Sequence, residues 1–148
     1  ASMRPVAGRL QWRSTTMGAS LIDDSYNANP SSMHAAIDVL ESLAGRRWLV
    51  MGDMAELGSY AVEAHAEAGR YARAHGVERM FAIGALTPHA VKSFGAGAEW
   101  FADAAALAAA VARELAPDVR ILVKGSRMNR LERVVESLTA TLPAARSA

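Results

Sequence analysis

The stretch that decides the fold is residues 48–84, WLVMGDMAELGSYAVEAHAEAGRYARAHGVERMFAIG. It opens with the apolar run 48–51, continues with an Ala-rich segment of helical period over 61–75, and closes with a second apolar run, 80–83. A glycine follows each of these three segments. A short aliphatic run, a helical segment and another such run are typical of a βαβ unit, whose helix connects two parallel strands. The stretch therefore predicts a parallel sheet.

The same alternation extends on both sides of this stretch. Leu21 and Ile22 form an earlier apolar run, and apolar residues at spacings of three and four predict a helix that starts after Pro30 and ends before Gly45. Further elements are predicted downstream, as helices over 88–94, 103–115 and about 129–142 and as strands over 100–101 and 119–123. The lead-in, about 1–20, predicts an antiparallel strand within 10–16.

No repeat, low-complexity tract or Pro/Gly/Ser linker divides the chain, which favours a single domain over residues 1–148. The predicted fold class is α/β: a doubly wound, mostly parallel, Rossmann-like sheet with helices on both faces.

Composition narrows the possible functions. With 51% hydrophobic residues among 148, the chain can bury a substantial core without disulfides. It has no cysteine, which excludes thiol nucleophiles and Cys-ligated metal centres. Sixteen basic and fifteen acidic residues give a net charge of +1, with no basic run, so nucleic-acid binding is not predicted. No apolar stretch is long enough to predict insertion into a membrane.

Polar residues gather where the predicted strands end. In open parallel sheets, ligands bind at the carboxyl ends of the strands, where loops converge and helix N-termini present free N–H groups. The candidates are Asp23, Asp24, Ser25, Tyr26, Asn27 and Asn29 after the first strand, Gly52, Asp53 and Glu56 after the second, Gly84 after the third, and Lys124, Gly125, Ser126 and Arg127 after the last. This set fits a phosphorylated ligand with Mg²⁺. Asp24, Ser25 and Asn29 equally suit a purely structural role as turn caps.

The histidines and the missing motifs limit the possible chemistry. His65, flanked by Glu63 and Glu67, is expected on the solvated face of its helix, and His75 is expected to interact with a helix C-terminal dipole. No partner is evident for His34 or His89. The chain contains no G-x-x-x-x-G-K-[ST] motif, so it has no P-loop of its own to hold nucleotide phosphates. If it handles ATP, it forms one wall of a larger site.

Three loops together carry a family resemblance. Residues 21–30 (LIDDSYNANP), 50–58 (VMGDMAELG) and 121–127 (ILVKGSR), in this order and spacing, closely resemble the C-terminal domain of the Mur ligase family. Residues 8–10 and 101–103 also match family positions, so the resemblance covers essentially the whole chain. Within the family, these loops resemble those of the ligase that adds D-alanyl-D-alanine to UDP-N-acetylmuramoyl-tripeptide in cytoplasmic peptidoglycan synthesis.

The resemblance implies a three-domain parent enzyme, whose N-terminal and central domains lie outside this sequence. An N-terminal domain would bind the UDP-sugar peptide, and a central P-loop domain would hold most of the ATP and Mg²⁺. ATP would convert the substrate carboxylate into an acyl phosphate, which the amine of D-alanyl-D-alanine would attack. The isolated chain is then expected to lack ligase activity.

The resemblance also implies roles for the loop residues. Asp24, Tyr26, Asn27 and Asn29 would face the nucleotide. The last loop would contact the dipeptide or the phosphoryl group, with Lys124 and Arg127 stabilising charge; its members are Lys124, Gly125, Ser126 and Arg127. Gly52, Asp53 and Glu56 form a loop signature with no metal ligand assigned. Residues 128–132 (MNRLE) are bulkier than the family pattern.

Two other hypotheses remain at this point. A phosphoacceptor receiver domain would use Asp53 as acceptor with Lys124 nearby, but Asp53 ends the second strand of the series, whereas a receiver's acceptor ends the third. A non-catalytic docking module with the same fold would expose an apolar patch and would be indifferent to nucleotide.

Overall fold

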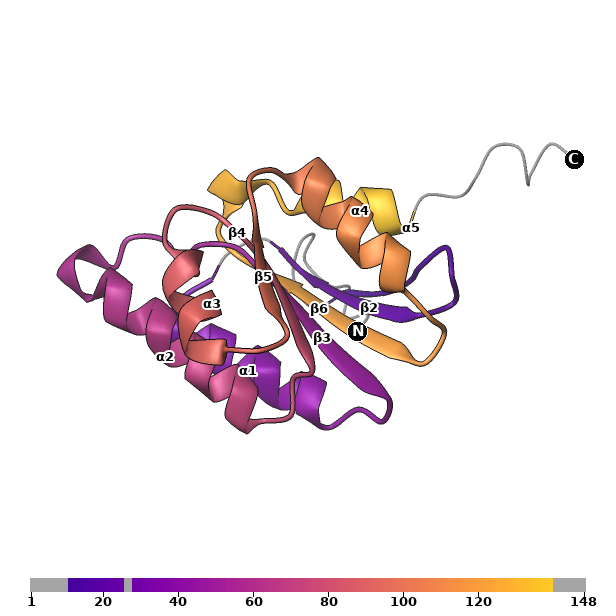
Figure 1. Cartoon of the computed structure of the whole chain (residues 1–148), viewed down its shortest axis with the longest axis horizontal. Helices are drawn as coiled ribbons and strands as arrows, with labels where there is room; N and C mark the ends of the chain where they lie inside the picture. Colours follow the sequence, from indigo (N-terminus) through magenta and orange to yellow (C-terminus); the bar gives the residue numbers. More distant parts are fainter. Residues whose placement is uncertain (1–10, 26–27, 140–148) are drawn as a thin grey trace, which may run out of the picture.

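The computed structural model describes residues 11–25 and 28–139, in which six strands form one sheet of order β1-β2-β6-β3-β4-β5 (Figure 1). The strands are β1 (Gln11–Ser14), β2 (Ser20–Asp24), β3 (Arg46–Met51), β4 (Arg79–Ile83), β5 (Ala98–Phe101) and β6 (Val119–Lys124). All neighbours pair in parallel except β1, which runs antiparallel to β2 at the edge. The predicted fold class and the antiparallel lead-in strand are both confirmed.

Helices cover both faces of this sheet (Figure 1). One face carries α1 (Pro30–Glu41), α2 (Ala61–Ala74) and α3 (Thr87–Phe94), and the other carries α4 (Ala104–Glu114) and α5 (Glu132–Thr139). Two short 3-10 turns, η1 (Gly58–Tyr60) and η2 (Arg127–Asn129), follow β3 and β6. No helix among the described residues is long and apolar enough to cross a bilayer.

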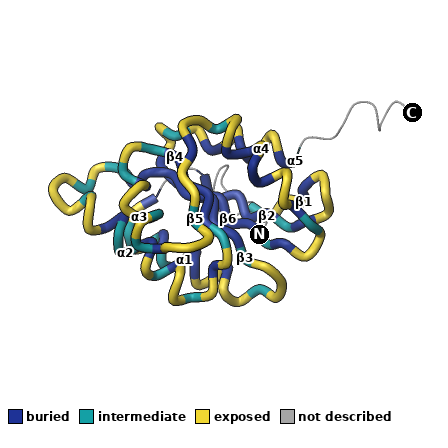
Figure 2. Tube along the Cα trace, in the orientation of Figure 1, coloured by how far each residue is buried: buried dark blue, intermediate teal, exposed yellow. Residues whose placement is uncertain are grey.

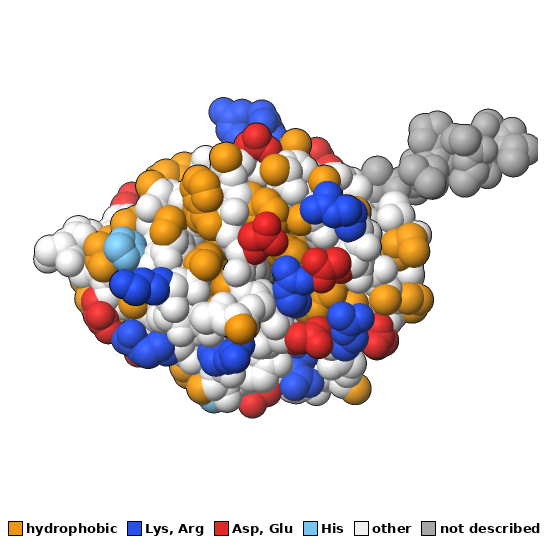
Figure 3. All heavy atoms as spheres, in the orientation of Figure 1, with side chains coloured by type: hydrophobic (Ala, Val, Ile, Leu, Met, Phe, Trp, Pro, Cys, Tyr) orange, Lys and Arg blue, Asp and Glu red, His pale blue; other side chains and the backbone are white. Residues whose placement is uncertain are grey.

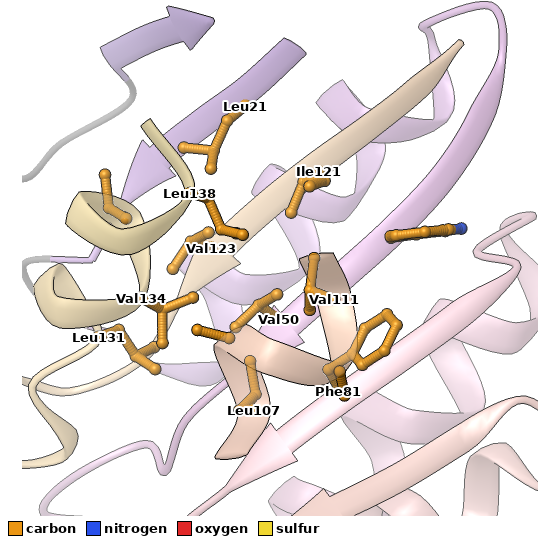
Figure 4. Close-up of a cluster of buried hydrophobic side chains, with 14 of the residues drawn as sticks. Leu21, Val50, Phe81, Leu107, Val111, Ile121, Val123, Leu131, Val134 and Leu138 are labelled. Carbon is orange, nitrogen blue, oxygen red and sulfur yellow. The ribbon is translucent and has the colours of Figure 1, made fainter. Parts of the chain in front are cut away.

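The strands are apolar on both sides because each side faces a layer of helices. In β3, Trp48 and Val50 join the core under α4 and α5, whereas Leu49 and Met51 join the core under α1, α2 and α3. Figure 2 shows these central strands buried within an exposed outer layer, and Figure 4 shows side chains of the strands facing those of α4 and α5. Each side chain buried in this way stabilises the fold by about 1.5–3 kcal/mol.

Some element boundaries differ from the prediction. Asp24 and Lys124, expected in loops after their strands, are the last residues of β2 and β6 and pair with each other in register. Helix α5 begins at Glu132, not at about 129, because η2 and the left-handed Arg130 (φ 52°) come first. The predicted end of this helix, near 142, lies outside the described residues.

Candidate functional site

A pocket of about 500 Å³ lies at the carboxyl edge of the sheet, where the loops after β2, β3 and β6 meet. These three strands are neighbours in the sheet, so residues far apart in sequence form one site, as the topology predicts. Its lining comes from all three loops and comprises Ala28, Asn29, Ala55, Glu56, Leu57, Ser126, Arg127 and Met128. The pocket therefore contains four of the predicted polar residues.

Beside the pocket, Lys124 and Asp24 form a buried ion pair. Lys124 Nζ lies 2.7 Å from Asp24 Oδ2, and the two side chains are 3% and 11% exposed. Buried charges of this kind persist only when they are paired, since each has lost its hydration shell. The pairing gives Asp24 a structural role, which is not the turn-capping role considered from the sequence.

After β2, the capping alternative is confirmed for Asn29, whereas Ser25 lies in a turn that the side chain of Asp23 caps. Asp23 Oδ1 accepts hydrogen bonds from Ser25 N (3.1 Å) and from Ser25 Oγ (2.6 Å), closing the turn. Asn29 caps α1: its Oδ1 accepts from Ser32 N at 2.9 Å, and Ser32 Oγ accepts from Asn29 N at 3.1 Å. Such a capping box satisfies amides that a helix start leaves unpaired. Tyr26 and Asn27 lie outside the described residues.

Asp53 caps a helix that is remote in sequence. Its carboxylate accepts hydrogen bonds from the amides of Ala85 and Leu86, just before α3, and of Thr87, the first residue of α3, at 2.9–3.1 Å. A Cβ at Gly84 would clash with this carboxylate, which accounts for the glycine there. The positive end of the helix dipole further stabilises a carboxylate at a helix N-terminus. With both oxygens engaged, Asp53 is poorly placed to act as a phosphoacceptor, which argues against the receiver hypothesis.

The backbone of Asp53 ties the β3 loop to the β6 loop. Asn129 Oδ1 accepts from Asp53 N at 2.6 Å, and Ser126 N donates to Asp53 O at 2.7 Å. Below them the two loops touch directly, because a Cβ at Gly125 would lie 2.7 Å from the Cα of Gly52. This close approach explains the glycine at 125, and a Cβ at Gly52 would lie 2.8 Å from Oδ1 of Asn129. The hydrogen bond between Ser126 N and Asp53 O holds Ser126 at the pocket.

Ser126 contributes a buried hydroxyl to the pocket. The residue is 3% exposed, and its Oγ has no hydrogen-bond partner within residues 11–25 and 28–139. A buried polar atom without a partner costs about 1–3 kcal/mol, so a folded protein rarely keeps one without a use for it. Arg127, which is exposed, and Glu56, at a left-handed φ of 60°, line the same pocket.

His65 is buried, which corrects the expectation that it lies on a solvated helix face. It is 0% exposed; its Nε2 accepts from Met54 N at 2.9 Å, and its Nδ1 lies 2.7 Å from Ala61 O. The acidic neighbours at 63 and 67 misled the prediction, because residues two positions away point to the other side of a helix. The better signal is the small-residue stripe at Ala64, Ala68 and Ala72, on the side that His65 shares.

A second polar cluster lies at the opposite, amino edge. His75 Nδ1 lies 2.9 Å from Glu41 Oε1, and the ring of Tyr71 stacks between the rings of His75 and His34. A hydrogen bond to Asp38, together with burial, raises the pKa of Tyr71. Within the described part of the chain, Asp38, Glu41 and His75 are the one group with ligand atoms close enough for a metal, within 4.8 Å. None of its members lines the pocket.

Comparison with known proteins places these features in a family. The family model "Mur ligase, glutamate ligase domain" matches residues 8–127. The chain is 41% identical over 140 residues to UDP-N-acetylmuramoyl-tripeptide--D-alanyl-D-alanine ligase of Escherichia coli and 36% identical over 137 residues to that of Bacillus subtilis. These alignments cover 93% and 88% of the chain but 31% and 30% of the relatives, so the chain spans under a third of their length.

A solved structure agrees with these matches. The MurF ligase of Thermotoga maritima in complex with ADP superposes with a TM-score of 0.80 at 29% identity, covering 93% of this chain and 31% of that one. The fold, the three loops and the sequence relatives thus agree. The chain belongs to the Mur ligase family, as a C-terminal, glutamate ligase domain that is similar to the corresponding part of the peptidoglycan-synthesis ligase MurF.

Proposed function

We propose that the chain serves as the C-terminal domain of an ATP-dependent ligase of cytoplasmic peptidoglycan synthesis. The reaction would join D-alanyl-D-alanine to UDP-N-acetylmuramoyl-tripeptide through an acyl phosphate, releasing ADP and phosphate. Support comes from the activity named for the E. coli and B. subtilis relatives and from the ADP in the T. maritima complex. This domain would close over substrates held by the N-terminal and central domains of the parent enzyme.

The observation that carries the proposal is the buried hydroxyl of Ser126, which has no hydrogen-bond partner in the described part of the chain, in a pocket that also presents Arg127. A hydroxyl donor and a guanidinium together suit an anionic oxygen, either of a phosphoryl group or of the dipeptide carboxylate. Negative charge grows on such oxygens as the amine attacks the acyl phosphate, so positioned donors favour the transition state. Lys124 and Asp24 together carry no net charge and would hold the ends of β2 and β6 together beside this pocket.

The pocket fits the nucleotide better than it fits a metal. The amide of Asn29, one of the residues that the family resemblance assigns to the nucleotide, lies in the lining, although its Oδ1 also caps α1. Asp24 Oδ2 is bound to Lys124, and the one metal-like group of the described residues is at the amino edge. Mg²⁺ would therefore arrive with ATP and be held mainly by the central domain.

The test is an NMR titration of the isotopically labelled chain with Mg-ATP, with D-alanyl-D-alanine, and with both. Amide shifts confined to residues 24–29 and 124–128 are expected, with a dissociation constant of about 1 mM, since one wall of a site provides a binding free energy of roughly −4 kcal/mol. No shift at high ligand concentration, or shifts spread over the amino edge, would contradict the proposal. The absence of any chemical-shift change would instead favour the non-catalytic docking module.

A second measurement addresses catalysis. Without a P-loop in its sequence, the chain alone is expected to form no amide from D-alanyl-D-alanine, ATP and the UDP-linked tripeptide. Amide production above a no-protein control would show that the isolated chain is itself a ligase, contrary to this proposal.

A further inference from the structure

His65 makes two hydrogen bonds that fix its protonation state. Ala61 O can only accept a hydrogen bond and Met54 N–H can only donate one, so Nδ1 carries the ring proton and Nε2 is bare. A doubly protonated ring would place two N–H groups face to face at Met54. The buried ring is therefore the neutral Nδ1–H tautomer, and it acts as an acceptor toward the β3 loop.

The bond to Met54 lies at the start of a pocket wall. Ala55, Glu56 and Leu57, the next three residues, all line the pocket. Glu56 has φ 60°, a left-handed conformation that costs a non-glycine residue about 1–2 kcal/mol and persists only where neighbouring contacts enforce it. His65 Nε2 bonds the chain just before Glu56, and the bond from Tyr60 N to Leu57 O (3.1 Å) holds it just after.

We propose that His65 is a positioning residue for this pocket. The neutral ring anchors the Met54 amide to α2 and thereby holds Glu56 in its left-handed conformation, which sets the wall opposite Ser126 and Arg127. The pocket would bind the ligands of the proposed function, a nucleotide and a dipeptide, so this part of the inference rests on the proposed function. The anchoring itself can be measured without any ligand.

Two variants separate the acceptor from the bulk of the ring. His65→Gln places an amide oxygen near the position of Nε2, whereas His65→Leu fills much of the same space and offers no acceptor. In the unsubstituted chain, NMR should detect a scalar coupling across the hydrogen bond between Met54 N and His65 Nε2. Hydrogen exchange at Met54 should stay slow in His65→Gln and accelerate by roughly tenfold in His65→Leu, the factor that one hydrogen bond of typical strength gives.

Ala72→Gly is the matched control, because it weakens the same helix near its far end, at a residue that is also 0% exposed. It should lower the melting temperature without moving the amide resonances of residues 54–57. If Ala72→Gly moves these resonances as much as His65→Leu does, or if Met54 exchanges at the parent rate in His65→Leu, His65 is not a positioning residue and the proposal is wrong.

Ligand titration of the same variants distinguishes this inference from the proposed function. His65→Gln should bind Mg-ATP and D-alanyl-D-alanine as tightly as the unsubstituted chain does. His65→Leu should bind them more weakly, with smaller ligand-induced shifts at residues 55–57 and 126–127. Equal binding by all three chains would overturn the positioning role. If the unsubstituted chain binds neither ligand, the proposed function is wrong. Hydrogen exchange at the Met54 amide would still decide whether His65 anchors the loop.

Discussion

The two ends of the sheet use charge in opposite ways. At the carboxyl edge, the Lys124–Asp24 pair is nearly inaccessible, with side chains 3% and 11% exposed; at the amino edge, the Arg46–Glu78 pair is 42% and 48% exposed. Exposed pairs contribute little because water screens them, whereas buried ones must be complete to be tolerated. Figure 3 shows basic and acidic side chains intermixed on the face in view, as solvated pairs of low energy allow. Ligand chemistry is expected where charge is buried and fixed.

The largest expected effect comes from opening the buried pair. Lys124→Met leaves Asp24 charged and unpaired, which should lower the free energy of unfolding by about 3–5 kcal/mol in urea titrations. Adding Asp24→Asn should recover part of this loss, because it removes the stranded charge. A loss no greater than that of Arg46→Met, at the exposed pair, would show that the two edges do not differ in this respect.

Removal of the remote cap should have the next largest effect. Asp53→Ala deprives the three amides of residues 85–87, at and just before the start of α3, of their acceptor; it should cost about 2 kcal/mol, with faster hydrogen exchange at these residues. Asp103→Ala is the matched control, since Asp103 caps α4 through one exposed bond to Ala106 N (2.8 Å) and should cost about 1 kcal/mol. Equal losses would mean that only one of the three bonds of Asp53 contributes.

At the amino edge, Glu78→Gln should cost only about 0.5 kcal/mol at neutral pH. The hydrogen bond from Trp48 Nε1 (2.9 Å), followed by that from Arg46, lowers the pKa of Glu78. The negative charge of Glu78 therefore stabilises the fold at pH values above the ordinary carboxyl pKa. This contribution is lost as the pH falls through the lowered pKa of Glu78. The difference in stability between parent and variant should thus disappear in acid; a difference that grows there would mean the pKa is raised.

No loss of stability is expected at Ser126. Ser126→Ala removes a buried hydroxyl with no partner among the described residues, so it should raise the free energy of unfolding, by up to the roughly 1–3 kcal/mol that burying an unpaired polar atom costs. Ser25→Ala is the control: Ser25 is also buried, but its Oγ donates to Asp23 at 2.6 Å, and its loss should cost about 1 kcal/mol. Binding of Mg-ATP or dipeptide should weaken only in Ser126→Ala. A large loss of stability there would mean the hydroxyl is already paired.

The sheet and the meeting of the polar loops at its carboxyl edge could be predicted because both follow from local patterns. Strands such as Trp48–Met51, apolar on both sides, indicate cover on two faces, and the polar residues behind them mark the carboxyl edge. The partners of Asp53 could not be predicted, because the amides that it caps lie more than 30 residues away and any polar residue near a helix start could have served. Asn129, which bonds to Asp53 N, was missed for the same reason.

The contact between Gly52 and Gly125 has a consequence for how this fold can diversify. A Cβ at Gly125 would lie 2.7 Å from the Cα of Gly52, and a Cβ at Gly52 would lie 2.8 Å from Oδ1 of Asn129, so neither position accepts a larger residue without displacing its neighbours. Any change in what the pocket prefers must therefore arise in its walls, at residues such as Glu56, Leu57, Arg127 and Met128. The sheet can stay constant through evolution while the loops exchange one substrate for another.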